Sequence, residues 1–157
     1  MEQPTGDAGI YARESEYLDR YVQFGEAGDR TISVSFPTQP EADSSEDHPL
    51  LDRIEAYLGG DEDNFEDVTV GLTVPTKQRT VLEAVDQIPY GEEGSVEQVV
   101  MMTQGLGADE EDDQRQVREA LAANPVPLLI PDHRVRDGPS GAPPEVEQKL
   151  QSVEGLY

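Results

Sequence analysis

The spacing of apolar residues changes near residue 75, and this change limits the folds that the chain can adopt. Before it, apolar residues alternate with polar ones, as in 31–36 (TISVSF) and 67–74 (DVTVGLTV), a pattern typical of strands with one buried face. After it, apolar residues recur three or four positions apart, as in amphipathic helices. We therefore expect a mixed α/β (α+β) fold, with a β-rich domain over residues 1–74 and a helical domain over residues 76–157.

The same spacing predicts individual elements. A further strand is expected over 17–24 (YLDRYVQF), and a helix within 48–60, where Pro49 suits the first turn and Gly59 the end. Ser95 and Gln98 form a capping-box pattern that opens a helix of the second part. The helices expected in that part cover residues 77–88, 95–103, 111–123 and 143–155.

Charge is strongly unbalanced, with 34 acidic residues against 11 basic ones and a net charge of −23. Such a balance indicates disorder, a cationic partner or a salty cell interior. The apolar periodicity argues against disorder. In molar salt the Debye length falls to about 3 Å, so the repulsion between like charges is largely screened. We interpret the acidity as adaptation to a halophilic cytosol, and an ordinary acidic soluble protein is the alternative.

The chain contains no cysteine, which excludes disulfides, thiolate metal sites and thiol catalysis. It also lacks an apolar run long enough to cross a bilayer and a signal-peptide pattern. We therefore expect a cytoplasmic, monomeric protein that does not associate with membranes.

Candidate chemistry is concentrated in residues 124–138 (NPVPLLIPDHRVRDG), where Asp132 and His133 are adjacent. These two residues allow a metal site, but His48 is the only other histidine and no EF-hand spacing is present, so we expect no metal and no cofactor. They also allow a carboxylate–histidine pair for hydrolysis. Adjacency in sequence alone does not decide between these chemistries.

Nucleic-acid binding is a third interpretation. The helices expected over 95–103 and 111–123 would form a helix-turn-helix, and Arg115 and Arg118 on the second helix could position phosphates or read bases. Residues 115–136 carry four arginines against two acids, which makes a locally positive segment in an acidic protein. Solvated surface arginines without a ligand are the plain alternative.

Three segments, VLEAVDQIPYGE (81–92), NPVPLLIP-x-HRV (124–135) and EVEQKLQSVEG (145–155), resemble the C-terminal domain of the alkylguanine-DNA alkyltransferase family, the methylated-DNA–protein-cysteine methyltransferases. The similarity covers residues 76–157. It implies a small RNase H-like N-terminal domain followed by a winged-helix or helix-turn-helix DNA-binding domain.

The resemblance also implies residue roles. Arg115 matches the arginine that takes the place of a flipped-out base, and Asn124 the asparagine between the recognition helix and the active-site loop. His133 and Glu154 match the pair that, with a water, deprotonates the acceptor thiol. Arg134 matches a structural arginine. The DNA-binding residues we expect are therefore Arg115, Arg118, Asn124, Arg134 and Arg136.

The sequence departs from the family pattern at several positions that bear on function. The acceptor cysteine is replaced by Asp132, a helix-turn-helix tyrosine by Val96 and a lysine of the last helix by Glu147, while the substrate loop becomes 137–144 (DGPSGAPP). Alkyl transfer to cysteine is therefore chemically impossible. In this respect the chain is similar to the alkyltransferase-like proteins, which lack the acceptor and bind alkylated DNA without repairing it.

We expect a repair-related protein, from a haloarchaeal source, that binds duplex DNA and flips and senses bases without transferring alkyl groups to cysteine. Alkylated DNA and a repair protein are the expected partners. A carboxylate at residue 132 would repel guanine O6 and suit a donor-bearing base edge better. Two alternatives remain: an enzyme in which Asp132 accepts an alkyl group as an ester that His133 and Glu154 hydrolyse, and a protein-interaction module without DNA binding.

Overall fold

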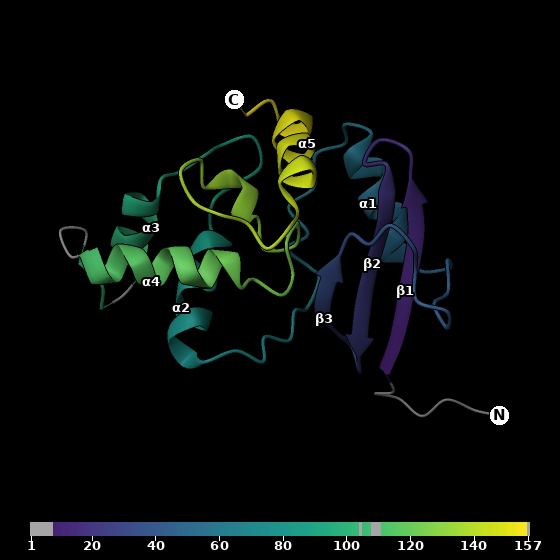
Figure 1. Cartoon of the computed structure of the whole chain (residues 1–157), viewed down its shortest axis with the longest axis horizontal. Helices are drawn as coiled ribbons and strands as arrows, with labels where there is room; N and C mark the ends of the chain where they lie inside the picture. Colours follow the sequence, from purple (N-terminus) through teal and green to yellow (C-terminus); the bar gives the residue numbers. More distant parts are fainter. Residues whose placement is uncertain (1–7, 104, 108–110, 157) are drawn as a thin grey trace.

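The structure, a computed structural model, describes residues 8–103, 105–107 and 111–156. A three-stranded antiparallel sheet comes first, in the order β1 (Ala8–Ser15), β2 (Arg20–Ala27) and β3 (Arg30–Ser35), and α1 (Pro49–Leu58) lies beside it (Figure 1). The mixed α/β fold expected from the sequence is confirmed.

The remaining elements are α2 (Thr76–Val85), α3 (Val96–Met102), α4 (Glu111–Ala122), the short 3₁₀ helix η1 (Asp132–Arg134) and α5 (Pro144–Glu154). In Figure 1, α2, α3 and α4 gather at the end of the molecule away from the sheet, and α5 and η1 lie between them and the sheet. All four expected C-terminal helices are present: most ends lie within one residue of the expected ones, and α2 ends three residues early.

The sheet differs from expectation in two places. Strand β1 was not foreseen, because Ile10 and Ala12 give it little apolar alternation. The expected strand over 17–24 is wrong in its first part: β2 begins only at Arg20, because Asp19 adopts a positive φ of 56° in the turn that joins β1 to β2.

The strand expected over 67–74 is also wrong. This segment makes a single parallel bridge to β3, in which Thr31 N donates to Thr69 O at 2.9 Å and Gly71 N donates to Thr31 O at 2.9 Å. Pairing stops after that one residue, so no ladder forms. The alternation of apolar residues still reflects burial, because Val68, Val70 and Leu72 of this extended segment pack against the hydrophobic core.

Helix ends follow the sequence closely. The capping box is present: Gln98 N donates to Ser95 Oγ at 3.1 Å, and Ser95 N donates to Gln98 Oε1 at 2.9 Å. His48 caps α1, because its Nδ1 accepts a hydrogen bond from Leu50 N at 3.0 Å. The histidine considered as a metal ligand is therefore used in a helix cap.

One hydrophobic cluster runs through the described residues and includes side chains from both sides of residue 75, among them Phe24, Ile54, Leu82 and Leu121. The domain division at that residue stays a prediction, and its ranges include residues 1–7, 104, 108–110 and 157, which lie outside the described part. Among the described helices, none has the length and apolarity needed to cross a membrane.

Candidate functional site

A buried carboxylate, Glu154, lies at the centre of the site. It is the last residue of α5, which ends there because Gly155 adopts a left-handed φ of 76°. Its carboxylate accepts hydrogen bonds from Arg134 of η1, from Tyr57 of α1 and from the backbone N–H of Gly91, the last at 3.1 Å. One side chain thus joins four segments that are distant in sequence.

The charge of Glu154 is stabilised by these donors. Burial by itself raises the pKa of this carboxyl, but hydrogen bonds from His133, Arg134 and Tyr57 outweigh burial and lower the pKa to about 2. Burial, and then the negative charge of Glu154, raises the pKa of the Tyr57 hydroxyl, which therefore stays protonated and donates to Glu154. The centre is built to keep Glu154 ionised.

His133 lies beside Glu154 with its side chain fully buried. Its Nε2 is 2.7 Å from Glu154 Oε2. Because an ionised carboxylate only accepts hydrogen bonds, Nε2 must carry the proton, which leaves a lone pair on Nδ1 in the neutral ring. Nδ1 has no hydrogen-bond partner among the described residues. The ring therefore has the orientation of a base, although the chain holds no thiol to deprotonate.

Arg134 completes the centre. Its Nε donates to Glu154 Oε1 at 2.8 Å and its Nη2 to Oε2 at 3.1 Å, so the pair is bidentate. Nη1 donates to the carbonyl oxygen of Ile88 at 2.6 Å, and the guanidinium lies 5.8 Å from the centre of the Tyr90 ring. Only 3% of Arg134 is exposed. The side chain therefore lies inside the protein, where its guanidinium makes internal contacts.

Asn124 shapes the loop between α4 and η1. Its Oδ1 accepts from Val126 N at 3.1 Å, and its Nδ2 donates to Ile130 O at 3.1 Å and to Asp132 Oδ2 at 3.0 Å. Within this loop Leu128 has a positive φ of 82°, a conformation that costs a non-glycine residue about 1–2 kcal/mol. The buried amide of Asn124 helps to hold the loop in this strained shape.

Asp132, at the position of the acceptor cysteine, is completely buried. Three donors satisfy its carboxylate: Asn124 Nδ2 at 3.0 Å, Ser140 Oγ at 2.6 Å and Gly141 N at 2.8 Å. A side chain at residue 141 could not fit, because its Cβ would lie 2.3 Å from Asn124 O. Asp132 therefore fastens the 137–143 loop against the end of α4, and does not pair with His133 or an arginine.

A second carboxylate lies near Asp132. Burial raises the pKa of Asp132, although hydrogen bonds from Ser140, Gly141 and Asn124 oppose the rise. Burial, and then the negative charge of Asp132, raises the pKa of Glu147 on α5 to about 7. This environment is rich in carboxylates, and it replaces the cysteine and lysine of the resembled family.

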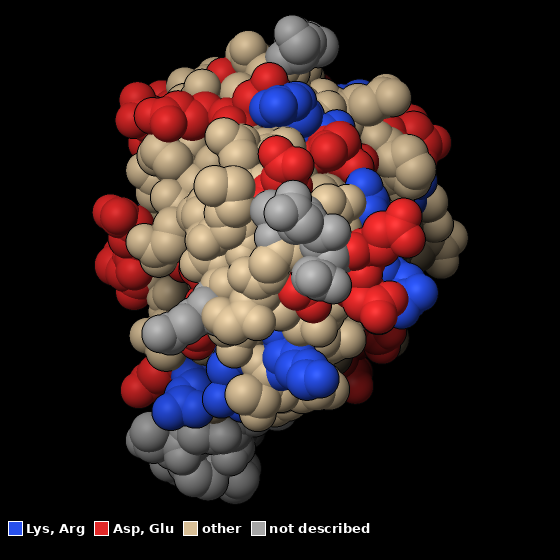
Figure 2. Space-filling view, turned by 90° about the vertical axis from the view of Figure 1, so that its left-hand side faces the viewer, with Lys and Arg blue, Asp and Glu red and all other residues tan. Residues whose placement is uncertain are grey.

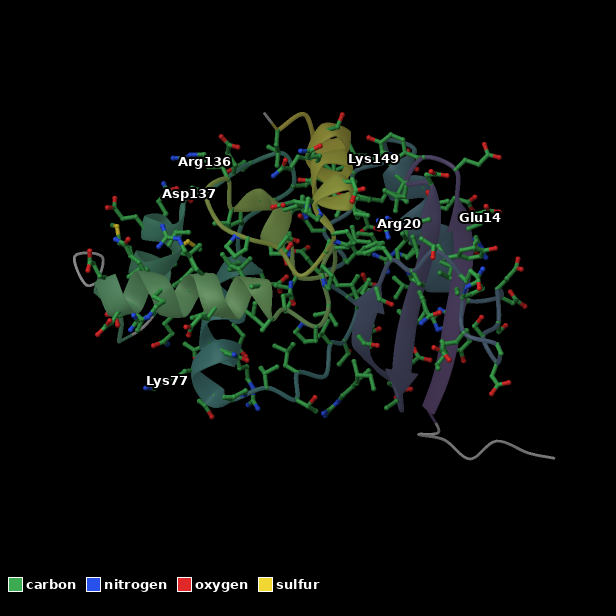
Figure 3. The ribbon with its side chains drawn as sticks, in the orientation of Figure 1. Glu14, Arg20, Lys77, Arg136, Asp137 and Lys149 are labelled. Atoms are coloured by element: carbon green, nitrogen blue, oxygen red, sulfur yellow. The ribbon has the colours of Figure 1, made fainter. Side chains whose placement is uncertain are left out.

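The five residues predicted to bind DNA separate into an exposed group and a buried group. Arg115, Arg118 and Arg136 are exposed, whereas Arg134 and Asn124 face inward. Arg115 Nη2 lies 2.7 Å from Asp112 Oδ1, an exposed pair that holds the side chain only weakly. Arg136 lies on the loop that follows η1, above α3 in the view of Figure 3. On the face drawn in Figure 2, basic residues form separate groups among acidic ones, so no continuous positive surface is present there.

Sequence reasoning missed two contributors. Tyr57 is one of them. It lies three residues after Ile54 on the buried side of α1, and this helical spacing could have predicted that its side chain faces inward. Ser140 lies in the 137–143 loop. No periodic pattern in that loop predicts that the Ser140 hydroxyl faces inward. Among the described residues, no three histidine or acidic side chains are grouped so that they could hold a metal ion.

Glu154 should make stability depend on pH. Its pKa is about 2 in the folded chain against an ordinary 4.5, so the stabilisation is complete above pH 4.5 and is lost as the pH falls towards 2. Glu154→Gln should lower the free energy of unfolding by about 3–5 kcal/mol near neutral pH, because Arg134 loses its buried partner. Urea denaturation should show this deficit shrinking below pH 4.5, and a deficit independent of pH would contradict the assignment.

Asp132→Ala should loosen the 137–143 loop, because three donors lose their acceptor at about 1–3 kcal/mol for each one left buried. We expect lower stability and faster hydrogen exchange at the amide of Gly141. Asp132→Asn is the matched control: its oxygen can still accept from Asn124 and Gly141, so the effect should be much smaller. Exchange at the parent rate in Asp132→Ala would refute the fastening role.

The chain is similar to known proteins both in sequence and in fold. A family model described as "6-O-methylguanine DNA methyltransferase, DNA binding domain" matches residues 76–152. The methylated-DNA–protein-cysteine methyltransferase of Methanopyrus kandleri is 36% identical over 110 residues, which cover 68% of this chain and 78% of that protein.

Solved structures extend the likeness to the whole fold. The O6-methylguanine methyltransferase of Mycobacterium tuberculosis aligns with a TM-score of 0.71 and 21% identity, covering 94% of this chain and 92% of that one. The same organism's protein in complex with DNA aligns with a TM-score of 0.71 and 22% identity, over 93% and 92% of the two chains. With the archaeal relative matched over two thirds of the sequence, the chain belongs to the methylated-DNA–protein-cysteine methyltransferase family.

Proposed function

We propose that the chain binds duplex DNA through the exposed arginines of α4, the second helix of the α3–α4 pair, and senses bases without transferring an alkyl group to itself. The observation that carries this proposal is the centre formed by His133, Arg134 and Glu154, which is complete around a position where Asp132 replaces the acceptor. A chain without cysteine has no thiol to alkylate. Of the family's two activities, DNA binding and alkyl transfer, only DNA binding therefore remains open to this chain.

The exposed arginines support the DNA-binding part. Arg115 and Arg118 lie one turn apart on α4, the second helix of the α3–α4 pair, as expected for residues that contact phosphates or replace an extruded base. Arg136 adds a third exposed cation on the loop after η1. Asn124 and Arg134 would act indirectly, by fixing the loop that leads from α4 to Asp132.

Base sensing would require the 137–143 loop to open. Asp132 is sealed by Ser140 and Gly141, so an extruded base meets that loop before it meets the carboxylate. Energy from DNA contacts would have to replace these two hydrogen bonds. A base edge with donors could do so by bonding to Asp132 directly, whereas guanine O6, an acceptor, could not.

The enzymatic alternative is less well supported. To accept an alkyl group as an ester, Asp132 would need an oxygen lone pair directed at the alkyl carbon. Both oxygens already accept hydrogen bonds from protein donors, and the side chain is fully buried. Donors that hold a carboxylate in this way lower its nucleophilicity.

Localisation and source remain proposals that rest on sequence. We propose a monomer in a halophilic, haloarchaeal cytosol, because a net charge of −23 is best tolerated where molar salt screens it. Because this net charge is negative, DNA must be bound through local, short-range contacts. The exposed arginines of α4 can make such contacts.

Arg115→Ala should weaken binding to duplex DNA about 5- to 150-fold, which corresponds to a loss of about 1–3 kcal/mol. Arg30→Ala is the matched control, since Arg30 is also exposed but lies on β3, in the sheet. Fluorescence anisotropy with a labelled duplex in KCl solutions up to molar concentration would measure both variants. Equal affinities for the parent and Arg115→Ala would refute the role of α4.

A further inference from the structure

A hollow of about 480 Å³ lies between α3 and the segment that joins α2 to α3. Its apolar wall comes from Ile88, Pro89, Met101 and Met102. The two methionines are 69% and 45% exposed, which is unusual for large apolar side chains on a protein this charged. Methionine is flexible and polarisable, and proteins use it on surfaces that adapt to apolar partners. The hollow therefore has the character of a docking surface.

The walls of this hollow are firmly held. Gln98 is fixed by the capping box, and Ile88 O is bound by Arg134 Nη1 at 2.6 Å. Gly94 N donates to Arg134 O at 2.8 Å, and Arg136 N donates to Gly94 O at 2.9 Å. A pre-formed surface loses less conformational entropy on binding than a mobile one. The same Arg134 that pairs with Glu154 thus also braces the docking surface.

The border of the hollow is acidic. Glu92 and Glu93 are exposed at its edge, Glu97 is exposed on α3, and the residues that line it include no lysine or arginine. Arg136 Nη1 lies 4.0 Å from Glu93 Oε1, in an exposed and therefore weak pair. Figure 2, which looks onto the end of the molecule that carries α3 and α4, shows a broad uncharged area with acidic residues along part of its border.

These charges select the occupant. At contact distance, the glutamates at the border would repel DNA phosphates as well as the same glutamates of a second copy of the chain. We propose that the hollow docks a basic segment of a partner protein, with apolar side chains against Met101 and Met102 and lysine or arginine side chains over Glu92 and Glu93. Since α4 does not line it, this surface leaves Arg115 and Arg118 available for DNA.

The test uses a synthetic amphipathic peptide with leucines three or four positions apart and lysines elsewhere, and a second peptide in which serines replace the leucines at equal charge. Isothermal titration should show binding of the leucine peptide and at least tenfold weaker binding of the serine peptide. In NMR spectra of the whole chain, the leucine peptide should shift the amide signals of residues 87–102. Absence of binding, equal binding of both peptides, or shifts elsewhere would each overturn the proposal.

Variants locate the surface and separate it from DNA binding. Met101→Ser with Met102→Ser should weaken peptide binding at least tenfold, whereas Ile10→Ser with Tyr17→Ser, the matched exposed control, should not. Glu92→Gln with Glu93→Gln should weaken it as well and reduce its salt dependence. All three double variants should bind duplex DNA like the parent. A methionine variant that keeps full peptide affinity, or self-association of the chain through this face, would overturn the proposal.

Discussion

The contact between Glu154 and Arg134 holds the rest of the site in place. A bidentate ion pair with both side chains almost fully buried is weak evidence for stability in itself, since desolvation offsets much of the attraction. Its importance lies in what it joins. Glu154 also binds His133, Tyr57 and the N–H of Gly91, so α1, α5, η1 and the segment after α2 all meet at one carboxylate. Removing Glu154 would leave a buried guanidinium without its carboxylate counter-ion.

This arrangement separates the scaffold of the site from its reaction. The centre around Glu154 needs no thiol to form, because every contact in it comes from residues other than Asp132. Residue 132 has its own partners, Asn124, Ser140 and Gly141, on the other side of η1. A carboxylate could therefore replace the acceptor without disturbing His133 or Arg134, and it contributes hydrogen bonds that close the loop over itself.

Local patterns in the sequence predicted local structure well. Helical spacing and the Ser95 capping box depend on neighbours within four residues, and both were confirmed. Strand β1 and the loose segment 67–74 depend on pairing between distant residues, which spacing alone does not report. The same limit applies to charge: Arg134 counted towards a positive segment in the sequence, but in the fold Glu154, twenty residues later, neutralises it. Tyr57 and Ser140 reach the site only through tertiary contacts.

We propose that the chain keeps the DNA-binding scaffold of its family without the transfer reaction. One measurement tests it most directly: incubation with duplex DNA carrying an O6-alkylguanine, recovery of the protein–DNA complex, and mass spectrometry of the intact protein and of the DNA. A complex should form, the protein mass should stay unchanged and the lesion should remain. A protein heavier by one alkyl group, a lesion that disappears, or no complex at all would contradict this proposal.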